Sequence, residues 1–380
     1  MESMLNCRLL DHFATIQDYR DPRWSQHLLI DILVIALCAV LCGADGWEEI
    51  ETFGRSHLDW FQQHLELPNG IPHHDTFRRV FERIRPDQFE ASFQSWVQSV
   101  VQHFKQEVVG VDGKSMRGSY TDSTDKTKGM LHIVSAWANQ NNLILGQIKT
   151  HDKSNEITAI PQLLRTLVLS GCIVTIDAMG CQRAIAKEIR EQGADYILTV
   201  KENQKTLHTA LEKAFIHADS VKFEALVYDQ HEEKDFAHGR IETRKCTVLP
   251  MMYLHEFKEK WEGLSSLVRI QSERIIKRTG EITAEISYCI SSLPCDAELI
   301  LSSKRQHWGV ENQVHWVLDV VFKEDASRIR DRASAQNFSA LRRLAINMIK
   351  RETGVKKSIR QRRMMAGWNI KYLEKVLSVN

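Results

Sequence analysis

The hydrophobic pattern changes its period near residue 107, and this change constrains the fold more than any other feature. Runs at 107–116, 130–139 and 142–151 are alternating or continuously apolar, as strands are. A helical segment, a continuous apolar strand at 172–176, an amphipathic helix and a strand at 195–202 follow. An order of β-β-β-α-β-α-β favours a mixed sheet covered by helices. The predicted fold class is therefore α/β.

The segments around this core have other periods, which predicts several units. Apolar side chains recur at three and four positions over the first hundred residues, as in helices. Residues 221–293 contain strand patterns separated by polar loops, and a helical pattern resumes after them. The expected units are a helical N-terminal module (1–104), a first part of the core (105–205), a β-rich insertion (206–295), a second part of the core (296–350) and a basic C-terminal tail (351–380).

The net charge of +1 conceals an uneven distribution of basic residues. From Arg342 to the end there are eleven Lys and Arg against two Glu, so these 39 residues carry 11 − 2 = +9. A basic tail on a nearly neutral body favours a nucleic-acid partner, with a solvated basic helix as the alternative.

Membrane and disulfide classes are not favoured. The apolar run at 28–44 contains Asp31 and is shorter than the ~20 residues that a membrane span needs, which predicts a buried helix. No basic start followed by a cleavage site indicates a signal peptide. The eight cysteines form no CxxC pair with zinc spacing and suggest no disulfide framework. We therefore expect a cytoplasmic protein without a membrane segment.

A Gly-Lys-Ser triplet at 113–115 invites comparison with a nucleotide-binding loop. A Walker A loop needs a second glycine five positions earlier, where this chain has Val108. The preceding residues suit a strand, and Asp112 would place a carboxylate where phosphate oxygens should lie. The sequence therefore predicts no nucleotide site, and Asp112 becomes the residue that requires an explanation.

Two aspartates follow apolar strands. Asp112 comes after Val-Val-Gly-Val, and Asp177 comes after Cys-Ile-Val-Thr-Ile. Open α/β sheets place their sites at the ends of buried strands. A buried carboxylate there costs free energy unless it is paired or binds a cation, and Mg²⁺ takes oxygen ligands. The pair predicts a divalent-metal site; the alternative is that each aspartate caps the turn that follows it.

A third acid is expected from the polar segment at 304–325. His307, Glu311, His315 and Asp319 lie four residues apart, on one slowly drifting face of a helix. Three interpretations remain open at this point. Glu311 completes a carboxylate site, the His-Glu-His set binds a transition metal, or the face is a polar seam under two tryptophans. Helical zinc sites place their histidines four apart, whereas these are eight apart, which disfavours the second.

Three blocks carry a resemblance to a known family. GVDGKSMRGS, TIDAMGCQ and HWGVENQVHWVLDVVFKEDASRIR closely resemble the signature blocks of bacterial insertion-sequence transposases, in the group that includes the H-repeat-associated proteins. Shorter blocks such as GIPHHDTFRRVF, YCISSL, NMIKRETG and AGWNIKYL extend the resemblance over nearly the whole chain, in the expected order.

The resemblance implies a transposase that cleaves and joins DNA with an RNase H-like catalytic domain. It implies a triad of Asp112, Asp177 and Glu311, which are both catalytic residues and ligands of two divalent ions, Mg²⁺ or alternatively Mn²⁺. It also implies double-stranded DNA as partner, at the transposon ends and the target, and a homodimer on that DNA. The alternatives are an RNase H-like nuclease without strand transfer and an inactive DNA-binding relic.

The sequence departs from the family beside the glutamate. Positions 305, 307 and 318 hold Arg, His and Leu, where related transposases often have Tyr, Arg and Lys. Phosphate contacts are therefore assigned to other basic residues, each with a solvated surface position as the alternative. The predicted DNA-contact residues are Lys114, Arg117, Lys201, Arg240, Arg244, Lys304, Arg305, Lys356, Lys357, Arg360, Arg362 and Arg363.

Overall fold

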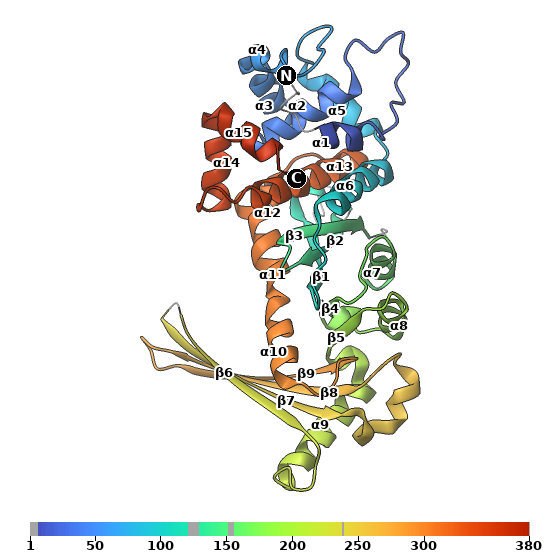
Figure 1. Ribbon diagram of the computed structural model, residues 1–380, viewed down its shortest axis with the longest axis vertical. Coiled ribbons are helices and arrows are strands. Elements are labelled where there is room, and N and C mark those ends of the chain that lie inside the picture. Colours follow the sequence, from blue (N-terminus) through green and yellow to red (C-terminus); the bar gives the residue numbers. More distant parts are fainter. Residues whose placement is uncertain (1–6, 121–128, 151–155, 238, 380) are drawn as a thin grey trace.

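The computed structural model describes residues 7–120, 129–150, 156–237 and 239–379. The molecule is elongated, with a helical module at one end, a sheet through the middle and a projecting pair of hairpins at the other end (Figure 1). One nine-stranded sheet runs in the order β3-β2-β1-β4-β5-β9-β8-β7-β6.

The first five strands form the core that the sequence predicts. Strand β1 pairs parallel with β4, β4 pairs parallel with β5, and β2 is antiparallel to both of its neighbours. This order and this single reversed strand are the RNase H-like arrangement. The strands are β1 (Val108–Met116), β2 (Leu131–Ala138), β3 (Leu143–Lys149), β4 (Ile173–Ile176) and β5 (Asp195–Val200).

Helices cover the two faces of this core, which explains the continuous apolar strands. Every residue of β4 is buried, as expected for a central parallel strand. Helices α7 (Glu156–Arg165) and α8 (Arg183–Glu191) lie on one side of the sheet, and the segment α10–α12 lies on the other (Figure 1). That segment consists of α10 (Ala297–Gln306), α11 (Trp308–Val310), a π-helical turn (Glu311–His315) and α12 (Trp316–Val320).

The strands expected in the insertion are present, and they extend the core sheet. Strand β9 pairs antiparallel with β5, so the hairpins β6–β7 and β8–β9 continue from the core strands. The first five residues of β9 are exposed and its last four are buried, because only that end packs on the body. The elements are α9 (Lys205–Ser220), β6 (Asp229–Ala237), β7 (Arg240–Pro250), β8 (Ser266–Ile276) and β9 (Ile282–Ser291).

The helical module assembles segments from both ends of the chain. The apolar helix α2 lies at its centre and is buried from Asp31 to Leu41, as predicted. Asp31 accepts a hydrogen bond from the Leu67 N–H at 3.0 Å. None of the described helices is long and apolar enough to cross a membrane. The module contains α1 (Cys7–Phe13), α2 (Leu29–Leu41), α3 (Trp47–Ser56), α4 (Leu58–Phe61), α5 (His74–Arg83), α6 (Pro86–Val100), α13 (Arg332–Arg351), α14 (Ile359–Trp368) and α15 (Ile370–Leu377).

The expected basic tail is instead folded, because α14 and α15 pack on α13 and α14 also contacts α2. The prediction that Arg362 and Arg363 contact DNA is wrong for the same reason. Arg362 is buried beside Glu352, and Arg363 is buried beside Asp45, with donor–acceptor distances of 3.1 and 3.0 Å. Five of the eleven basic side chains counted from residue 342 onward are buried, namely Arg342, Arg343, Lys350, Arg362 and Arg363. These buried side chains therefore contribute little to the basic surface that the sequence of this region suggests.

Gly309 lets the segment α10–α12 approach the sheet closely. A Cβ at this position would collide with Asn139 Oδ1 and would lie 2.9 Å from Trp137 Nε1. At Gly110, by contrast, a Cβ would meet the His307 carbonyl oxygen at 3.4 Å, an ordinary contact distance. The helix backbone therefore rests directly on β2 at Gly309.

Gly309→Ala should destabilise the protein, although alanine favours helix, because its methyl group has no space beside Asn139 and Trp137. We expect the free energy of unfolding in urea to fall by about 1–3 kcal/mol, the usual cost of overpacking. Gly110→Ala is the control from the same contact and should cost less. Equal stability of Gly309→Ala and the wild type would contradict this packing.

Candidate active site

The parallel pairing of β1 and β4 brings the two predicted aspartates together. Val111 on β1 is paired with Ile176 on β4, and Asp112 and Asp177 are the next residues of each chain segment. Both carboxylates therefore leave the sheet at the same edge, where open α/β sheets place their sites. The sequence placed both aspartates at strand ends, which is correct for Asp177 and wrong for Asp112. Strand β1 continues to Met116 against β2, and only its pairing with β4 ends at Val111.

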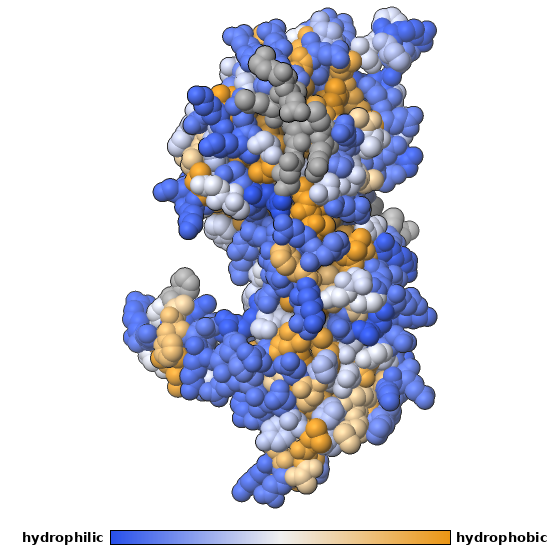
Figure 2. Space-filling view, in the orientation of Figure 1, coloured by the Kyte–Doolittle hydropathy of each residue, from blue (hydrophilic) through white to orange (hydrophobic). Residues whose placement is uncertain are grey.

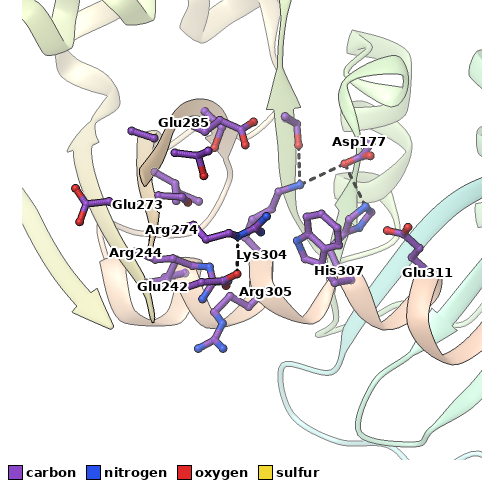
Figure 3. A pocket seen from close by; sticks show the side chains of 18 of the residues that line it. Asp177, Glu242, Arg244, Glu273, Arg274, Glu285, Lys304, Arg305, His307 and Glu311 are labelled. Atoms are coloured by element: carbon purple, nitrogen blue, oxygen red, sulfur yellow. Dashed lines mark hydrogen bonds and ion pairs between the residues drawn. The ribbon is translucent and has the colours of Figure 1, made fainter. Parts of the chain in front are cut away.

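Glu311 reaches the same edge from the other side of the site. It is the first residue of the π-helical turn, immediately after the short helix α11 that packs on β1 and β2. Single π-turns within α-helices occur frequently at functional sites. All three acids line one open cavity of about 640 Å³. Figure 3 shows the Glu311 and Asp177 side chains on either side of His307.

Asp177 is held in its ionised form by two basic neighbours. His307 Nε2 lies 3.2 Å from Asp177 Oδ1, and Lys304 Nζ lies 3.4 Å from the same oxygen. The hydrogen bond from His307 and the positive charge of Lys304 hold the pKa of Asp177 well below its usual range, although burial opposes this. His307 Nδ1 lies 3.0 Å from Thr175 Oγ1, which fixes the ring, and Lys304 donates to Thr199 Oγ1 at 2.7 Å.

The pKa of Asp112 is shifted in the opposite direction to that of Asp177. Burial raises its pKa to about 6, against a hydrogen bond from the Gly113 N–H and the charge of His307, and the negative charge of Asp177 raises it further. His315 Nδ1 lies 3.5 Å from Asp112 Oδ2, but burial lowers the pKa of His315 to about 3, so this imidazole is neutral at physiological pH. The two aspartates therefore differ in proton affinity although they are neighbours.

The donor set fits divalent cations that prefer oxygen. Three carboxylates face a polar cavity, and the mutual repulsion of Asp112 and Asp177 would be relieved by positive charge between them. Across the described ranges, the only three ligating side chains within 4.8 Å of one another are Glu51, His73 and His74, in the helical module. The three acids thus surround the cavity and do not converge on one point.

The transition-metal interpretation of the His-Glu-His face is not supported. His307 contacts Asp177 and His315 contacts Asp112, so the two rings serve different aspartates. Asp319, the fourth member of that face, forms an ion pair with Lys114 at 2.7 Å. The sequence identified these positions as a polar face, but their individual partners depend on where the segment meets β1 and β4.

Apart from the half-buried Arg240, the predicted DNA-contact residues fall into three groups. Four of them line the cavity, namely Lys201, Arg244, Lys304 and Arg305. Arg305 pairs with Glu233 and Asp235, and both Arg240 and Arg244 pair with Glu242. Arg117, Lys356, Lys357 and Arg360 are exposed, and the last three belong to the helical module. Lys114, Arg362 and Arg363 are buried.

Lys114 was therefore assigned wrongly as a phosphate contact. It lies within β1 and is 9 % exposed, and its ammonium group contacts the carboxylates of Asp319 and Asp325 at 2.7 and 2.8 Å. The Gly-Lys-Ser triplet is part of strand β1. The residue that sequence reasoning missed as a partner of Asp177 is His307, four positions before Glu311.

The strand order defines a fold of the RNase H-like class, and comparisons assign the family. Residues 103–348 match the model of the transposase DDE domain, and residues 10–97 match the model of the region associated with it. The chain belongs to the DDE transposase family. The N-terminal helices of the module therefore correspond to the associated region, whereas the core, the insertion and most of α13 correspond to the DDE domain.

Relatives that are similar in sequence agree with this assignment. The chain is 40% identical over 376 residues, 98% of both chains, to the "H repeat-associated putative transposase YhhI" of Escherichia coli (strain K12). It is also 48% identical over 73 residues to the "Inactive transposase YbfQ" of the same organism, covering 19% of this chain and 87% of that one. A solved piggyBac transposase synaptic complex with hairpin DNA aligns with a TM-score of 0.43 and 11% identity, over 98% of this chain and 78% of that one.

The raised pKa of Asp112 leads to a prediction about stability without metal. Its folded pKa of about 6 exceeds the ordinary value of 3.8, so the folded state binds this proton more tightly than the unfolded state. Wild-type stability should fall as pH rises from about 4 to 7, by ~1–3 kcal/mol from this group. Asp112→Asn has no titrating group at this position and should not lose this stability. In EDTA, its free energy of unfolding should therefore rise relative to that of the wild type between pH 4 and 7.5.

Urea unfolding at the two pH values measures the difference. Added Mg²⁺ should then stabilise the wild type more than Asp112→Asn, because ligand binding to the folded state raises stability. A pH-independent difference between the two proteins would contradict the environment described for Asp112.

Proposed function

We propose that this chain is a DNA transposase that cleaves DNA strands at the ends of an insertion sequence and joins the freed ends to target DNA. The observation that carries the proposal is the placement of Asp112, Asp177 and Glu311 around one open polar cavity. Membership of the DDE transposase family and identity over nearly the full length of a relative support it.

The three acids are the proposed ligands of two divalent ions, Mg²⁺ or Mn²⁺. When bound, such ions activate the attacking water or 3′-hydroxyl and stabilise the leaving oxygen of an in-line displacement. The chain contributes the oxygen ligands and gives the two aspartates different proton affinities. His307 and Lys304 keep the Asp177 carboxylate ionised and oriented, and neutral His315 lies beside Asp112 without adding a competing positive charge.

The surroundings of the cavity support a DNA substrate. Figure 2 shows a hollow between the body and the projecting hairpins, with a mainly hydrophilic visible rim. Cationic side chains from the core and from the hairpins line the cavity, namely Lys201, Arg244, Arg274, Lys304 and Arg305. Phosphate contacts from Lys and Arg dominate affinity for DNA. We assign the transposon ends and target DNA to this hollow, with a homodimer bringing two ends together.

Substitution of the acids tests the chemistry. Asp112→Asn, Asp177→Asn and Glu311→Gln should each reduce nicking by roughly 10³-fold or more, because each removes a ligand from a metal-dependent site worth several kcal/mol. The substrate is a supercoiled plasmid carrying the coding sequence with its genomic flanks, with Mg²⁺ present. Circular dichroism and DNA binding serve as controls and should be retained. Full activity of any variant would remove that residue from the triad.

Two other functions would use the same site. A nuclease on this fold would nick the plasmid but would not join the freed 3′ ends to a second DNA, so a strand-transfer assay with labelled ends separates it from a transposase. An inactive DNA-binding relic would bind the flanks and cut nothing. The intact set of three acids favours catalysis over the relic.

The exposed basic residues of the helical module generate a binding prediction. Replacing Lys356, Lys357 and Arg360 together with Ala should weaken binding to flank DNA and reduce the slope of log K against log salt by about 0.9 for each phosphate that the variant no longer neutralises. Fluorescence anisotropy over a salt series measures this slope. Lys187→Ala, which removes an exposed lysine of α8, is the control. An unchanged slope in the triple variant would place the DNA elsewhere.

A further inference from the structure

Lys114 lies on β1 two residues after Asp112, so both side chains leave the strand on the same face. Its Nζ is 2.7 Å from Asp319 Oδ1, 2.8 Å from Asp325 Oδ1 and 3.6 Å from Glu324 Oε2. Asp319 belongs to α12, and the other two carboxylates belong to the short 3-10 turn Glu324–Ala326. One ammonium group therefore joins the first catalytic strand to the end of the acidic segment.

The contacts continue into the centre of the protein. The Glu324 carboxylate is completely buried and lies 3.1 Å from the guanidinium of Arg343 on α13. Arg343 also donates to Ser135 Oγ on β2 at 3.2 Å. Lys114 is thus the link between the sheet and a buried charged network that spans β1, β2, α12 and α13.

No hydrogen bond or ion pair holds the Glu311 side chain within the described part of the chain, so the backbone on either side sets its position. Upstream, His307 contacts Asp177, and Gly309 rests on β2. Within the π-turn, Gln313 accepts a hydrogen bond from Lys350 at 2.8 Å, and His315 lies 3.5 Å from Asp112. The contact of Asp319 with Lys114 holds the far end of the segment on β1.

We propose that Lys114 is a positioning residue for the proposed cleavage reaction: it ties α12 to β1 and so holds the Glu311 carboxylate across the cavity from Asp112 and Asp177. This inference rests on the proposed function of the triad. It differs from the phosphate contact that the sequence suggested for Lys114. The ammonium group already contacts two carboxylates, and the Lys114 side chain is only 8% exposed. A phosphate would therefore have to displace those carboxylates before it could bind.

Lys114→Met removes the charge and keeps most of the side-chain length. We expect kcat for plasmid nicking to fall by about 10–100-fold, the usual effect of losing a group that orients a metal ligand. The half-saturating Mg²⁺ concentration should rise, whereas KM for DNA and the salt slope of binding should stay unchanged. Removal of a group that neutralises a phosphate would instead lower the salt slope by about 0.9. Lys187→Met controls for removal of a lysine elsewhere and should match the wild type in all four quantities.

A second substitution tests the mechanism by a double-mutant cycle. Lys114→Met and Asp319→Asn each break the same contact between β1 and α12, so the second change removes little beyond the first. The double variant should therefore have about the same kcat as Lys114→Met. A DNA contact by Lys114 would act independently of Asp319, and the losses from the two single changes would then multiply. A reduced salt slope in Lys114→Met, or multiplied losses in the double variant, would overturn the proposal.

Two further measurements keep the test decisive. If Lys114→Met does not fold, Asp319→Asn alone should show the same loss of kcat and the same raised Mg²⁺ requirement without altering any basic residue; a normal Mg²⁺ requirement there would overturn the proposal. Mg²⁺-induced thermal stabilisation, measured without DNA, should be smaller in Lys114→Met than in the wild type. If the wild type cleaves no DNA, the proposed function fails, while this metal readout still tests the role of Lys114.

Discussion

The site depends on the parallel pairing of β1 with β4. Because Val111 is opposite Ile176, the aspartates that follow them leave the sheet together. Neither strand alone produces this arrangement, since each aspartate at a free strand end would be an ordinary solvated carboxylate. The pairing also places Asp112 where burial and the charge of Asp177 raise its pKa, which gives two chemically similar residues different proton affinities.

Glu311 is positioned in a different way, by the close approach of a helix backbone to a strand. Gly309 has no side chain to separate the acidic segment from β2, and His307 reaches Asp177 because of this proximity. Charged contacts then hold the far end of the segment, through Lys114 and the buried Glu324–Arg343 pair. Burying such a pair is favourable only with good geometry and satisfied partners, so the network constrains the segment to a narrow set of positions.

Sequence reasoning predicted the core strands, the covering helices, the β-rich insertion and the buried helix α2, because each follows from a local periodicity of apolar residues. It named Asp112, Asp177 and Glu311, but only their positions after apolar runs and on a helix face were readable directly. It was wrong about Lys114, Arg362 and Arg363, since basic residues near a motif or in a basic stretch carry no signal of burial. The carboxylate partners of Lys114 and Arg363 come from distant segments, as Asp45 does for Arg363, over a separation of 318 residues.

The sequence by itself determined which segments are strands and helices, and it placed an acid after each of two apolar runs. Those properties are local, because they depend on side-chain periodicity and on neighbouring residues along the chain. Only the tertiary structure decided which charges meet: His307 with Asp177, His315 with Asp112, and Lys114 with Asp319. The physical reason is that Coulomb and hydrogen-bond contacts act over a few ångströms in space, and separation in sequence does not reveal that distance.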